Sequence, residues 1–453
     1  MILVTPLVPL RHDRALCCRP VLSRLLARVG LVTPEQRAWA WYDCGNSAYF
    51  TTVITAVFPA FFASYAAAGM PAGEATTRFG LVTTVGMAIV AIAAPILGAY
   101  GDYTARRKRL LVGCAFVGIA STFALTTITE GGWRWAALVF VIGNIGVSGS
   151  LVFYDSMLPS VASAAETDRV SSAGYALGYL GGGLLLVLNL AWVLQPQMFG
   201  LSGTVAAIKL SFASVGVWWL LFMIPLLRHV PEPPRVTMPG DTARGGAVRA
   251  SFVRLAHTFS EIRQYRQAFL ALLAMLVYQD GIQTIIRFAG IYGAEVGVGQ
   301  SSQIAAFAMV QLLGVPFAFL FGSLGPRLGT KRAIFLALSV YTVAAVLGYF
   351  MQNATHFFLL AGLVATVQGG AQALSRALFS RLIPPAKTSE YFGFYAVVER
   401  FATILGPLVF TLSGALTGSS RSAVLGMIAF FVAGGWLLSR VDVEEGERAA
   451  QRI

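Results

Sequence analysis

The strongest constraint on the fold of this sequence is a series of apolar segments, each long enough to cross a lipid bilayer. Of its 453 residues, 57% are hydrophobic and only 12% are charged, whereas an ordinary soluble domain has about 25% charged residues. A hydrocarbon core about 30 Å thick needs roughly 20 apolar residues per helix, and every backbone N–H and C=O inside it must pair within the protein. The chain is therefore predicted to be an all-α integral membrane protein.

Segmentation on this length predicts twelve transmembrane helices in two groups of six. The groups are residues 38–227 and 267–439, and a basic, proline-containing linker at 228–266 separates them. The predicted spans are 38–66, 77–101, 110–128, 135–157, 169–193, 205–227, 267–293, 301–324, 333–351, 356–380, 390–415 and 421–439. Residues 1–37 and 440–453 are predicted to be tails. The first tail interleaves arginine with leucine, which favours an interfacial amphipathic helix or a disordered segment over a signal peptide.

A duplicated segment indicates that the two groups of helices are related. Gly98 to Arg109 closes one apolar segment with a small-residue helix end and a basic turn, and a degenerate copy, Gly322 to Arg332, starts 224 positions later. Gly181 recurs as Gly406 at nearly the same interval. A common register predicts two parallel, pseudo-symmetric six-helix bundles, which is the architecture of many secondary transporters.

The net charge of +13 is concentrated in alternate loops. In a soluble protein this charge would suggest a nucleic-acid partner. Here the basic residues lie between apolar runs, at 106–109, 228–266, 327–332 and 381–387, so we predict no nucleic-acid partner. Because cytoplasmic loops are enriched in lysine and arginine, both termini are predicted to lie in the cytoplasm.

The basic segment resembles the loop signature of the major facilitator superfamily, which is matched by Gly98, Asp102, Arg106 and Arg107, with Ala105 in place of its second glycine. Five further blocks resemble the vacuole-effluxer-like branch of that superfamily. They are Trp41–Tyr49, Phe153–Pro159, Ala176–Gly182, Tyr278–Ile285 and Gly369–Arg376. The branch is named for a fungal autophagy-related protein that exports amino acids from the vacuole. The resemblance implies the major facilitator fold, with transport by alternating access and amino acids as the favoured substrates.

Asp102, with Arg106 or Arg107, is predicted to act as a gate between the two halves. A carboxylate at a helix end and the basic run after it can make charge-assisted hydrogen bonds to the other half on the cytoplasmic side. Such contacts exist in one access state and break in the other. Lys108 and Arg109 are explained by topology and by contact with anionic lipid.

Three residues depart from the pattern that the branch implies. Asp155 stands where asparagine is expected, and we assign it to the gate. Glu399 stands where a small residue is expected, and Pro326 stands where the basic segment usually has aspartate. Without that aspartate, the second copy of the segment is not expected to form a charged latch.

Ionisable and amide side chains inside the predicted helices are the candidates for substrate binding or coupling. A charge at the bilayer centre costs at least about 2.5 to 3.5 kcal/mol, so such residues usually face a cavity or a partner. The candidates are Asp43, Asn46, Asp280, Gln283, Arg287, Gln368, Gln372, Arg376, Glu399 and Arg400. Their helical spacing on helices 1, 7 and 10 predicts stripes that line one central aqueous cavity.

Individual roles follow from side-chain chemistry. Arg287 and Arg376 are predicted to hold a substrate carboxylate, because a guanidinium offers a planar two-donor fork. The glutamines are either neutral substrate contacts or polar contacts between helices. Asp280 and Glu399 are the hypothetical sites of proton coupling. Alternatively, Asp280 forms a structural ion pair with Arg287 or Arg376, or Glu399 pairs with Arg376. Asp43 is either a cavity residue or a capping carboxylate near the cytoplasmic interface.

No catalytic arrangement competes with a transport function. The four histidines lie in predicted tails or loops, no phosphate-binding loop occurs, and the four cysteines lack the spacing of metal ligands. We predict no enzyme and no cofactor, but a monomeric secondary transporter of a small polar or zwitterionic metabolite in a bacterial inner membrane. A multidrug or metabolite exporter of the same fold is one alternative. A non-transporting receptor, scramblase-like or assembly protein is the other.

Overall fold

The computed structural model describes residues 26–27, 29–70, 72–233, 265–401, 406, 409 and 421–451. All regular structure within these ranges is helical, which confirms the all-α prediction. Eleven segments in the described part of the chain are long and apolar enough to cross a membrane. The twelfth predicted span, 390–415, starts in the described part, and most of its second half lies outside it.

The first half of the chain forms one bundle. Its first span is a continuous helical rod whose middle and end are π-helical: α2 (Pro34–Ala48), η2 (Tyr49–Val57), α3 (Phe58–Phe61) and η3 (Phe62–Ala66). The remaining elements are α4 (Ala72–Thr104), α5 (Arg107–Leu125), α6 (Trp133–Ser156), α7 (Leu158–Val161), α8 (Thr167–Leu194), η4 (Pro196–Phe199) and α9 (Thr204–His229).

The second half forms the other bundle. Its elements are α11 (Arg266–Glu295), α12 (Gln300–Leu328), α13 (Thr330–Tyr349), α14 (Ala354–Arg381), η5 (Pro385–Lys387), α15 (Thr388–Phe401), α17 (Arg421–Ser439) and α18 (Val443–Ala450). The predicted C-terminal tail at 440–453 therefore contains a short helix. Most of the predicted linker at 228–266 lies outside the described residues.

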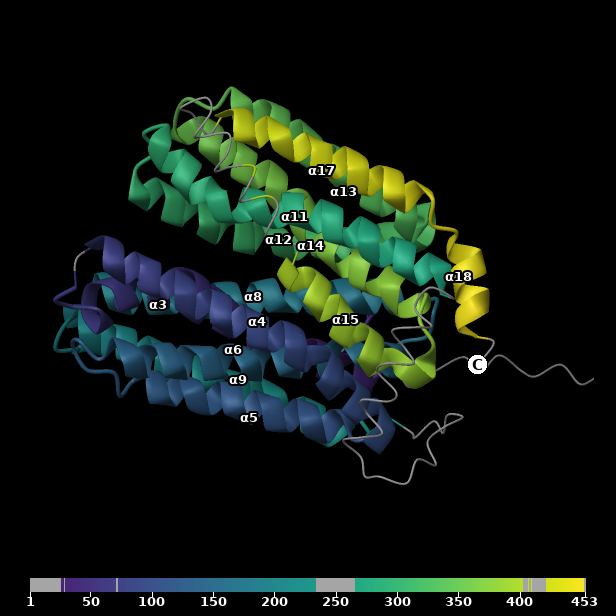
Figure 1. Cartoon of the computed structure of the whole chain (residues 1–453), viewed down its shortest axis with the longest axis horizontal. Coiled ribbons are helices and arrows are strands. Elements are labelled where there is room, and N and C mark those ends of the chain that lie inside the picture. The colour runs from purple at the N-terminus through teal and green to yellow at the C-terminus, as the bar shows by residue number, and fades with distance from the viewer. Residues whose placement is uncertain are drawn as a thin grey trace, which may run out of the picture.

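The two bundles lie side by side, with α15 running along the boundary between them (Figure 1). Each bundle has its own buried apolar core. Across the boundary, α4 packs against α15 and α8 packs against α12. We call the end of the bundles where α2 begins and α17 ends the terminal face. In Figure 1 this is the end near the marked C-terminus and α18.

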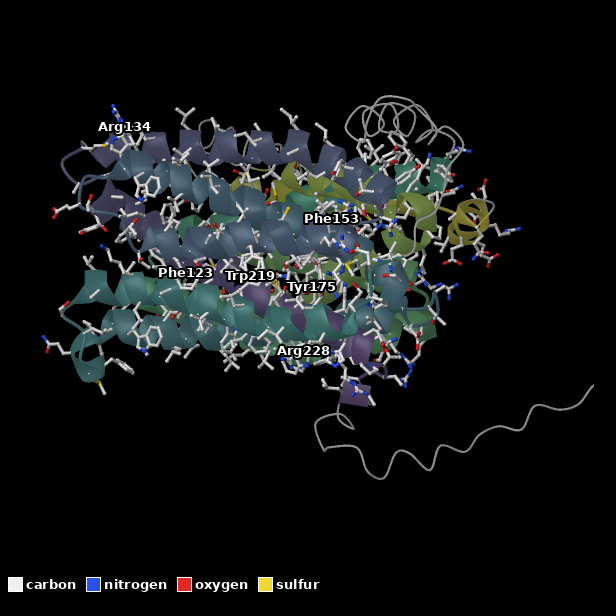
Figure 2. All side chains as sticks on the ribbon, turned by 90° about the horizontal axis from the view of Figure 1, so that it is seen from below. Phe123, Arg134, Phe153, Tyr175, Trp219 and Arg228 are labelled. Atoms are coloured by element: carbon white, nitrogen blue, oxygen red, sulfur yellow. The ribbon has the colours of Figure 1, made fainter. Side chains whose placement is uncertain are left out.

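The outer surface of the bundles is apolar along most of its length. Large hydrophobic side chains such as Leu81, Ile92 and Leu359 are more than half exposed. Charged side chains gather toward the two ends of the helices, where Figure 2 places Arg134 at the end opposite the terminal face. An exposed apolar belt between two polar ends is the surface expected of a chain that lipid surrounds.

The two basic segments form sharper junctions than the sequence predicts. Only Ala105 and Arg106 separate α4 from α5, and only Gly329 separates α12 from α13. Ala105 has φ 50° and Gly329 has φ 87°, so both junctions use the left-handed region that favours glycine. Ala105 is the one non-glycine residue with positive φ among the described residues. At both junctions, consecutive helices therefore follow each other with at most two residues between them.

Candidate functional site

The carboxylate of Asp102 joins the two halves at the terminal face. It lies at the end of α4 and accepts hydrogen bonds from the backbone N–H groups of Ser389 at 3.2 Å and Glu390 at 2.9 Å. Both N–H groups lie in the first turn of α15, and a carboxylate at a helix N-terminus is favoured by both its hydrogen bonds and the helix dipole. Asp102 therefore caps a helix of the opposite half.

Arg107 orients this cap. Its Nε donates to Asp102 Oδ1 at 2.7 Å, and its guanidinium donates to the carbonyl oxygen of Pro385 at 3.3 Å, again in the other half. The neighbouring Arg106 is exposed. Of the two arginines considered for the gate, the structure therefore places Arg107 at Asp102.

A second charged contact joins the halves on the other side of the boundary. Asp168 of α8 accepts a hydrogen bond at 2.6 Å from the hydroxyl of Thr330 in α13, and it lies 3.6 Å from the guanidinium of Arg381 in α14. Arg381 also lies 3.5 Å from Glu447 of α18. Pro326 supplies no charge, and the second basic segment contributes the hydroxyl of Thr330, whereas the ion pair at this interface joins Asp168 to Arg381, which lies outside the segment. That the segment itself forms no charged latch stays a prediction.

The lysines of the basic segments hold each bundle together internally. Lys108 donates at 2.8 and 2.6 Å to the carbonyl oxygens of Leu227 and Val230 at the end of α9. Lys331 likewise donates to two carbonyl oxygens, those of Ser439 and Val441, at the end of α17. Glu232 adds to the contact between Lys108 and the end of α9 by accepting a hydrogen bond at 2.7 Å from the backbone N–H of Lys108. The explanation of Lys108 by topology and lipid alone is therefore corrected.

A third contact lies deeper, where Arg376 of α14 enters the first bundle. Its guanidinium donates to Asp155 Oδ1 at 2.9 Å, to the hydroxyl of Ser171 at 3.0 Å and to the Ser171 carbonyl oxygen at 2.9 Å. The side chain is 2% exposed. Asp155 thus contacts the other half, as a gate residue would. Arg376 is paired with Asp155 rather than being open to a substrate carboxylate.

Three aromatic rings of the first bundle surround the same guanidinium. Its Cζ lies 4.9 Å from the ring centre of Trp39, 5.5 Å from that of Tyr154 and 4.4 Å from that of Tyr175. Figure 2 shows Tyr175 on the side of the terminal face, and its side chain is half-buried. Stacking of a guanidinium on aromatic faces adds a favourable electrostatic contact to the ion pair.

Asp43 of α2 lies beside this cluster and is buried. Its Oδ1 accepts a hydrogen bond from Ser47 at 3.3 Å, and the charges of Arg376 and Asp155 both act on it. Its Oδ2 has no hydrogen-bond partner among the described residues, nor does the side-chain nitrogen of Asn46. The cluster therefore holds two carboxylates for one guanidinium and leaves one carboxylate oxygen unoccupied.

The glutamines of α14 approach Tyr179 from the other half. The Tyr179 hydroxyl donates to Gln372 Oε1 at 3.4 Å, and Gln368 lies beside the same hydroxyl. Glycines make room for this ring, because a Cβ at Gly369 would lie 2.7 Å from Tyr179. Gln368 and Gln372 thus lie at the boundary between the bundles, which is where we predicted a cavity.

Asp280 contacts residues of its own half. Its Oδ1 accepts hydrogen bonds from the backbone N–H of Gly406 at 2.9 Å and from Thr284 at 3.5 Å. Gln283 is partly buried one turn further along α11. Arg287, Glu399 and Arg400 belong to α11 and α15, but their side chains lie outside the described part of the chain, so the predicted pairs that involve them stay predictions.

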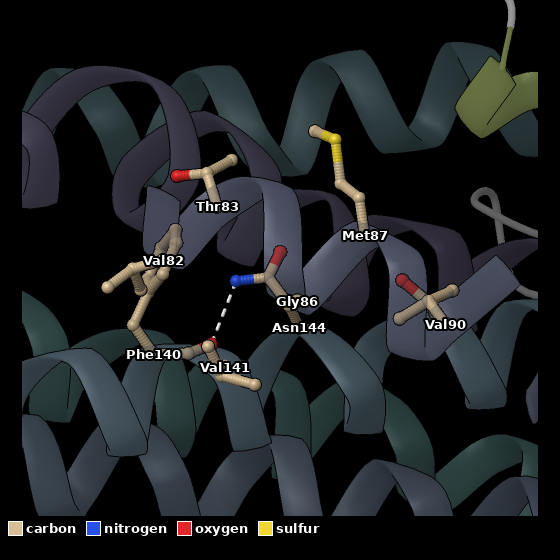
Figure 3. A pocket seen from close by; sticks show the side chains of 9 residues that line it. Val82, Thr83, Gly86, Met87, Val90, Phe140, Val141 and Asn144 are labelled. Atoms are coloured by element: carbon tan, nitrogen blue, oxygen red, sulfur yellow. Dashed lines mark hydrogen bonds between the residues drawn. The ribbon is translucent and has the colours of Figure 1, made fainter. Parts of the chain in front are cut away.

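A shallow crevice between α4 and α6 is mainly apolar (Figure 3). Its lining includes Val82, Met87, Val90 and Phe140, and the amide of Asn144 donates to the Phe140 carbonyl oxygen at 2.8 Å. The crevice therefore presents little polar surface to a solute. Within the described ranges, no group of three histidine, cysteine, aspartate or glutamate side chains is placed to hold a metal ion.

Sequence reasoning missed the partners of several site residues. Trp39, Tyr154 and Tyr175 lie within or next to the blocks that carry the family resemblance, but nothing in the sequence singles them out from packing aromatics. Asp168 and Arg381 lie at helix ends in basic or polar loops, where topology alone accounts for them. The repeat did offer a signal for Asp168. Pseudo-symmetry between the halves pairs the second basic segment with α8, and Asp168 is the acidic residue in the first turn of that helix.

Comparison with known proteins identifies the family of this chain. A family model described as vacuole effluxer Atg22 like matches residues 75–451. The uncharacterized MFS-type transporter YxiO of Bacillus subtilis is 37% identical over 422 residues, which cover 93% of this chain and 97% of that protein. Autophagy-related protein 22 of Yarrowia lipolytica is 27% identical over 315 residues, which cover 63% of this chain and 52% of the fungal protein. The chain spans about half the length of that fungal relative.

Solved structures of low sequence identity share the fold. The human organic anion transporter MFSD10 aligns with a TM-score of 0.67 at 15% identity, over 89% of this chain and 99% of that one. A double-tryptophan mutant of XylE aligns with a TM-score of 0.70 at 14% identity, over 95% and 100% of the two chains. Because the family model covers most of the sequence, the chain belongs to the vacuole effluxer Atg22-like family, as an integral membrane protein of the major facilitator fold.

Proposed function

We propose that this protein is a secondary active transporter that moves a small polar or zwitterionic metabolite by alternating access, without enzymatic chemistry. The observation that carries the proposal is the Asp102 contact, in which a side chain of one half caps a helix of the other. Such a contact can part and re-form without breaking either helix. The terminal face, which we take to be cytoplasmic, is closed in this structure.

Two further layers support a gated closure at that face. Asp168 with Arg381 joins the halves at the surface, and Asp155 with Arg376 joins them deeper. Buried ion pairs are costly to desolvate and contribute little net stability. Because these ion pairs lie together at one end of the boundary, we interpret them as contacts that hold one conformational state. A protein whose halves do not move would have little use for them there.

Amino acids are the substrates that the family favours, and the site offers a place for their ammonium group. Asp43 Oδ2 is buried without a hydrogen-bond partner in the described part of the chain, and a buried acceptor gains about 1.5 to 3 kcal/mol from a charged donor. Gln368 and Gln372 offer neutral donors and acceptors at the same boundary. The family description favours export as the direction.

Proton coupling remains part of the proposal, through Asp280 or Glu399. Asp280 is buried in the middle of a membrane-spanning helix, and a carboxylate that a proton or a positive group can neutralise is suited to coupling. Asp280→Asn and Glu399→Gln should abolish gradient-driven accumulation yet spare exchange of substrate across the membrane. If both variants still concentrate substrate, coupling lies elsewhere.

Flux out of loaded proteoliposomes tests the transport function itself. Vesicles loaded with a mixed amino-acid pool should release one class of solute, faster with a pH gradient than without. Asp102→Asn should change the rate, whereas a change of the exposed Arg109 to glutamine serves as the matched control at the same face. Absence of flux for every solute, together with specific binding of a protein or lipid, would favour the non-transporting alternative. Flux of hydrophobic drugs alone would favour a multidrug exporter.

We further propose a monomer in a bacterial inner membrane with both termini in the cytoplasm. The basic loops at the terminal face support this orientation, and the Bacillus relative is consistent with a bacterial membrane.

A further inference from the structure

The guanidinium of Arg376 occupies a site that is built by the other half of the molecule. Arg376 belongs to α14 of the second bundle, whereas Asp155, Ser171 and the three rings around it belong to the first bundle. A carboxylate, a hydroxyl, a carbonyl oxygen and aromatic faces together form a receptor for a planar organic cation. We call Trp39, Tyr154, Asp155, Ser171 and Tyr175 the cation cage.

The cage does not depend on Arg376 for its shape. Trp39 and Tyr154 stack with ring centres 4.3 Å apart and an interplanar angle of 9°. The indole N–H of Trp39 donates at 2.9 Å to the carbonyl oxygen of Tyr154, which fixes the ring to α6. Both contacts lie within the first bundle. Because they persist when the bundles separate, the aromatic walls are preorganised for a cation that arrives from solution.

Space for the cation comes from a glycine. A Cβ at Gly174 would lie 3.0 Å from the Trp39 ring and 3.3 Å from a terminal nitrogen of Arg376. A larger residue at this position of α8 would push against both the wall and the guanidinium. Glycine at this position therefore leaves room for the guanidinium beside Trp39.

If the halves separate at the terminal face, as the proposed function requires, Arg376 must leave the cage with its own bundle. Asp155 and the rings then face the opened cavity without a cation, beside Asp43. We propose that the cation cage is a substrate subsite for a guanidinium group, and that Arg376 occupies it as a surrogate ligand while the terminal face is closed. The inference rests on alternating access, and it assigns a guanidinium-bearing substrate class.

Removal of the surrogate tests the cage directly. Purified Arg376→Ala is titrated with methylguanidinium chloride against equal sodium chloride, and thermal unfolding is followed. A ligand that binds only the folded state raises its midpoint with the logarithm of the ligand concentration, and we expect a rise of about 2 to 4 °C at about 100 times the Kd. The rise should vanish in Arg376→Ala combined with Asp155→Asn. Arg109→Ala, which removes an exposed guanidinium and leaves Arg376 in the cage, should show a smaller rise than Arg376→Ala, because Arg376 competes with the ligand for the cage.

A second measurement keeps the original Arg376 and does not depend on the stability of that variant. Ser156 and Ser389 face each other across the halves, with hydroxyl oxygens 3.0 Å apart. In a background without the four native cysteines, a Ser156→Cys, Ser389→Cys pair forms a disulfide only while the terminal face is closed. Methylguanidinium should slow this crosslink about threefold or more, because it binds the vacated cage and favours the open state. Addition of Gly174→Ala should abolish the slowing.

The outcomes separate the two proposals. Amino-acid flux with no effect of methylguanidinium on either unfolding or crosslinking would overturn the cage as a substrate subsite while leaving the transporter intact. A crosslink that forms completely and at once under all conditions, with no flux of any solute, would overturn alternating access itself. Methylguanidinium stabilising Arg376→Ala to the same degree with and without Asp155→Asn would also overturn the cage.

Discussion

Substitution of Asp102 by asparagine should open the terminal face. In the closed state the carboxylate accepts from Arg107 at 2.7 Å, Ser389 at 3.2 Å and Glu390 at 2.9 Å. Asparagine keeps one oxygen but turns an amide NH₂ toward donors, so at least one charge-assisted hydrogen bond is lost. Such a bond is worth about 1.5 to 3 kcal/mol. In the open state Asp102 keeps only the contact with Arg107, which belongs to the same half, so the loss of a hydrogen bond to Ser389 or Glu390 falls on the closed state alone.

That difference predicts a shift of the closed-to-open equilibrium by about 10- to 150-fold, since every 1.4 kcal/mol is tenfold. Ser172 provides a remote reporter, because it is buried on α8 where a Cβ at Gly322 of α12 would lie 2.7 Å away. A cysteine at position 172 should be alkylated faster in Asp102→Asn by that factor. Asp442→Asn removes a carboxylate at the same face that caps α18 within one half, and it should leave the rate unchanged. Equal rates in all three proteins, each folded, would refute the latch.

Three further predictions concern stability, measured as thermal unfolding in detergent. Ala105→Gly should stabilise by about 0.5 to 1 kcal/mol, because the left-handed φ of 50° costs alanine more than glycine adds in unfolded-state entropy; a lower midpoint would show that the junction is not strained. Lys108→Met should destabilise by about 1 to 3 kcal/mol, because two helix-end carbonyl oxygens lose a charged donor, while the exposed Arg109→Met serves as its neutral control. Gly146→Ala should destabilise by about 1 to 3 kcal/mol, because its Cβ would lie 2.5 Å from the backbone of α5. Gly113→Ala, which meets nothing within 4 Å, should be neutral or stabilising by up to about 1 kcal/mol.

Hydropathy and the repeat were sufficient to predict the membrane class, the helices and the two related halves. Each helix needs only its own apolar length and internal hydrogen bonds, so local sequence decides it. The position of Asp102 at the boundary between the halves could also be predicted, because this residue lies at a helix end inside a duplicated segment. The helix boundaries at the two basic segments were harder to predict. The left-handed φ of Ala105 and Gly329 lets consecutive helices follow each other more closely than the basic residues suggested.

The partners of the charged residues depended on the tertiary structure. Arg376 was readable as an intramembrane charge, but helical periodicity gives the face of one helix and not the face it meets. Sequence reasoning offered Glu399 or Asp280 as its partner, whereas packing of α14 against α8 brings it to Asp155. Likewise, Asp168 replaces the charge missing at Pro326 only because α8 and α12 touch.

The sequence by itself therefore determined that this chain spans a membrane, where the eleven spans of its described part lie and where its charges lie along them. Only the tertiary structure decided which charges meet across the two halves, because in lipid the docking of helices depends on close fit between their surfaces rather than on hydrophobicity. That fit places a guanidinium of one half in an aromatic and acidic cage of the other, which no pattern within a single helix encodes.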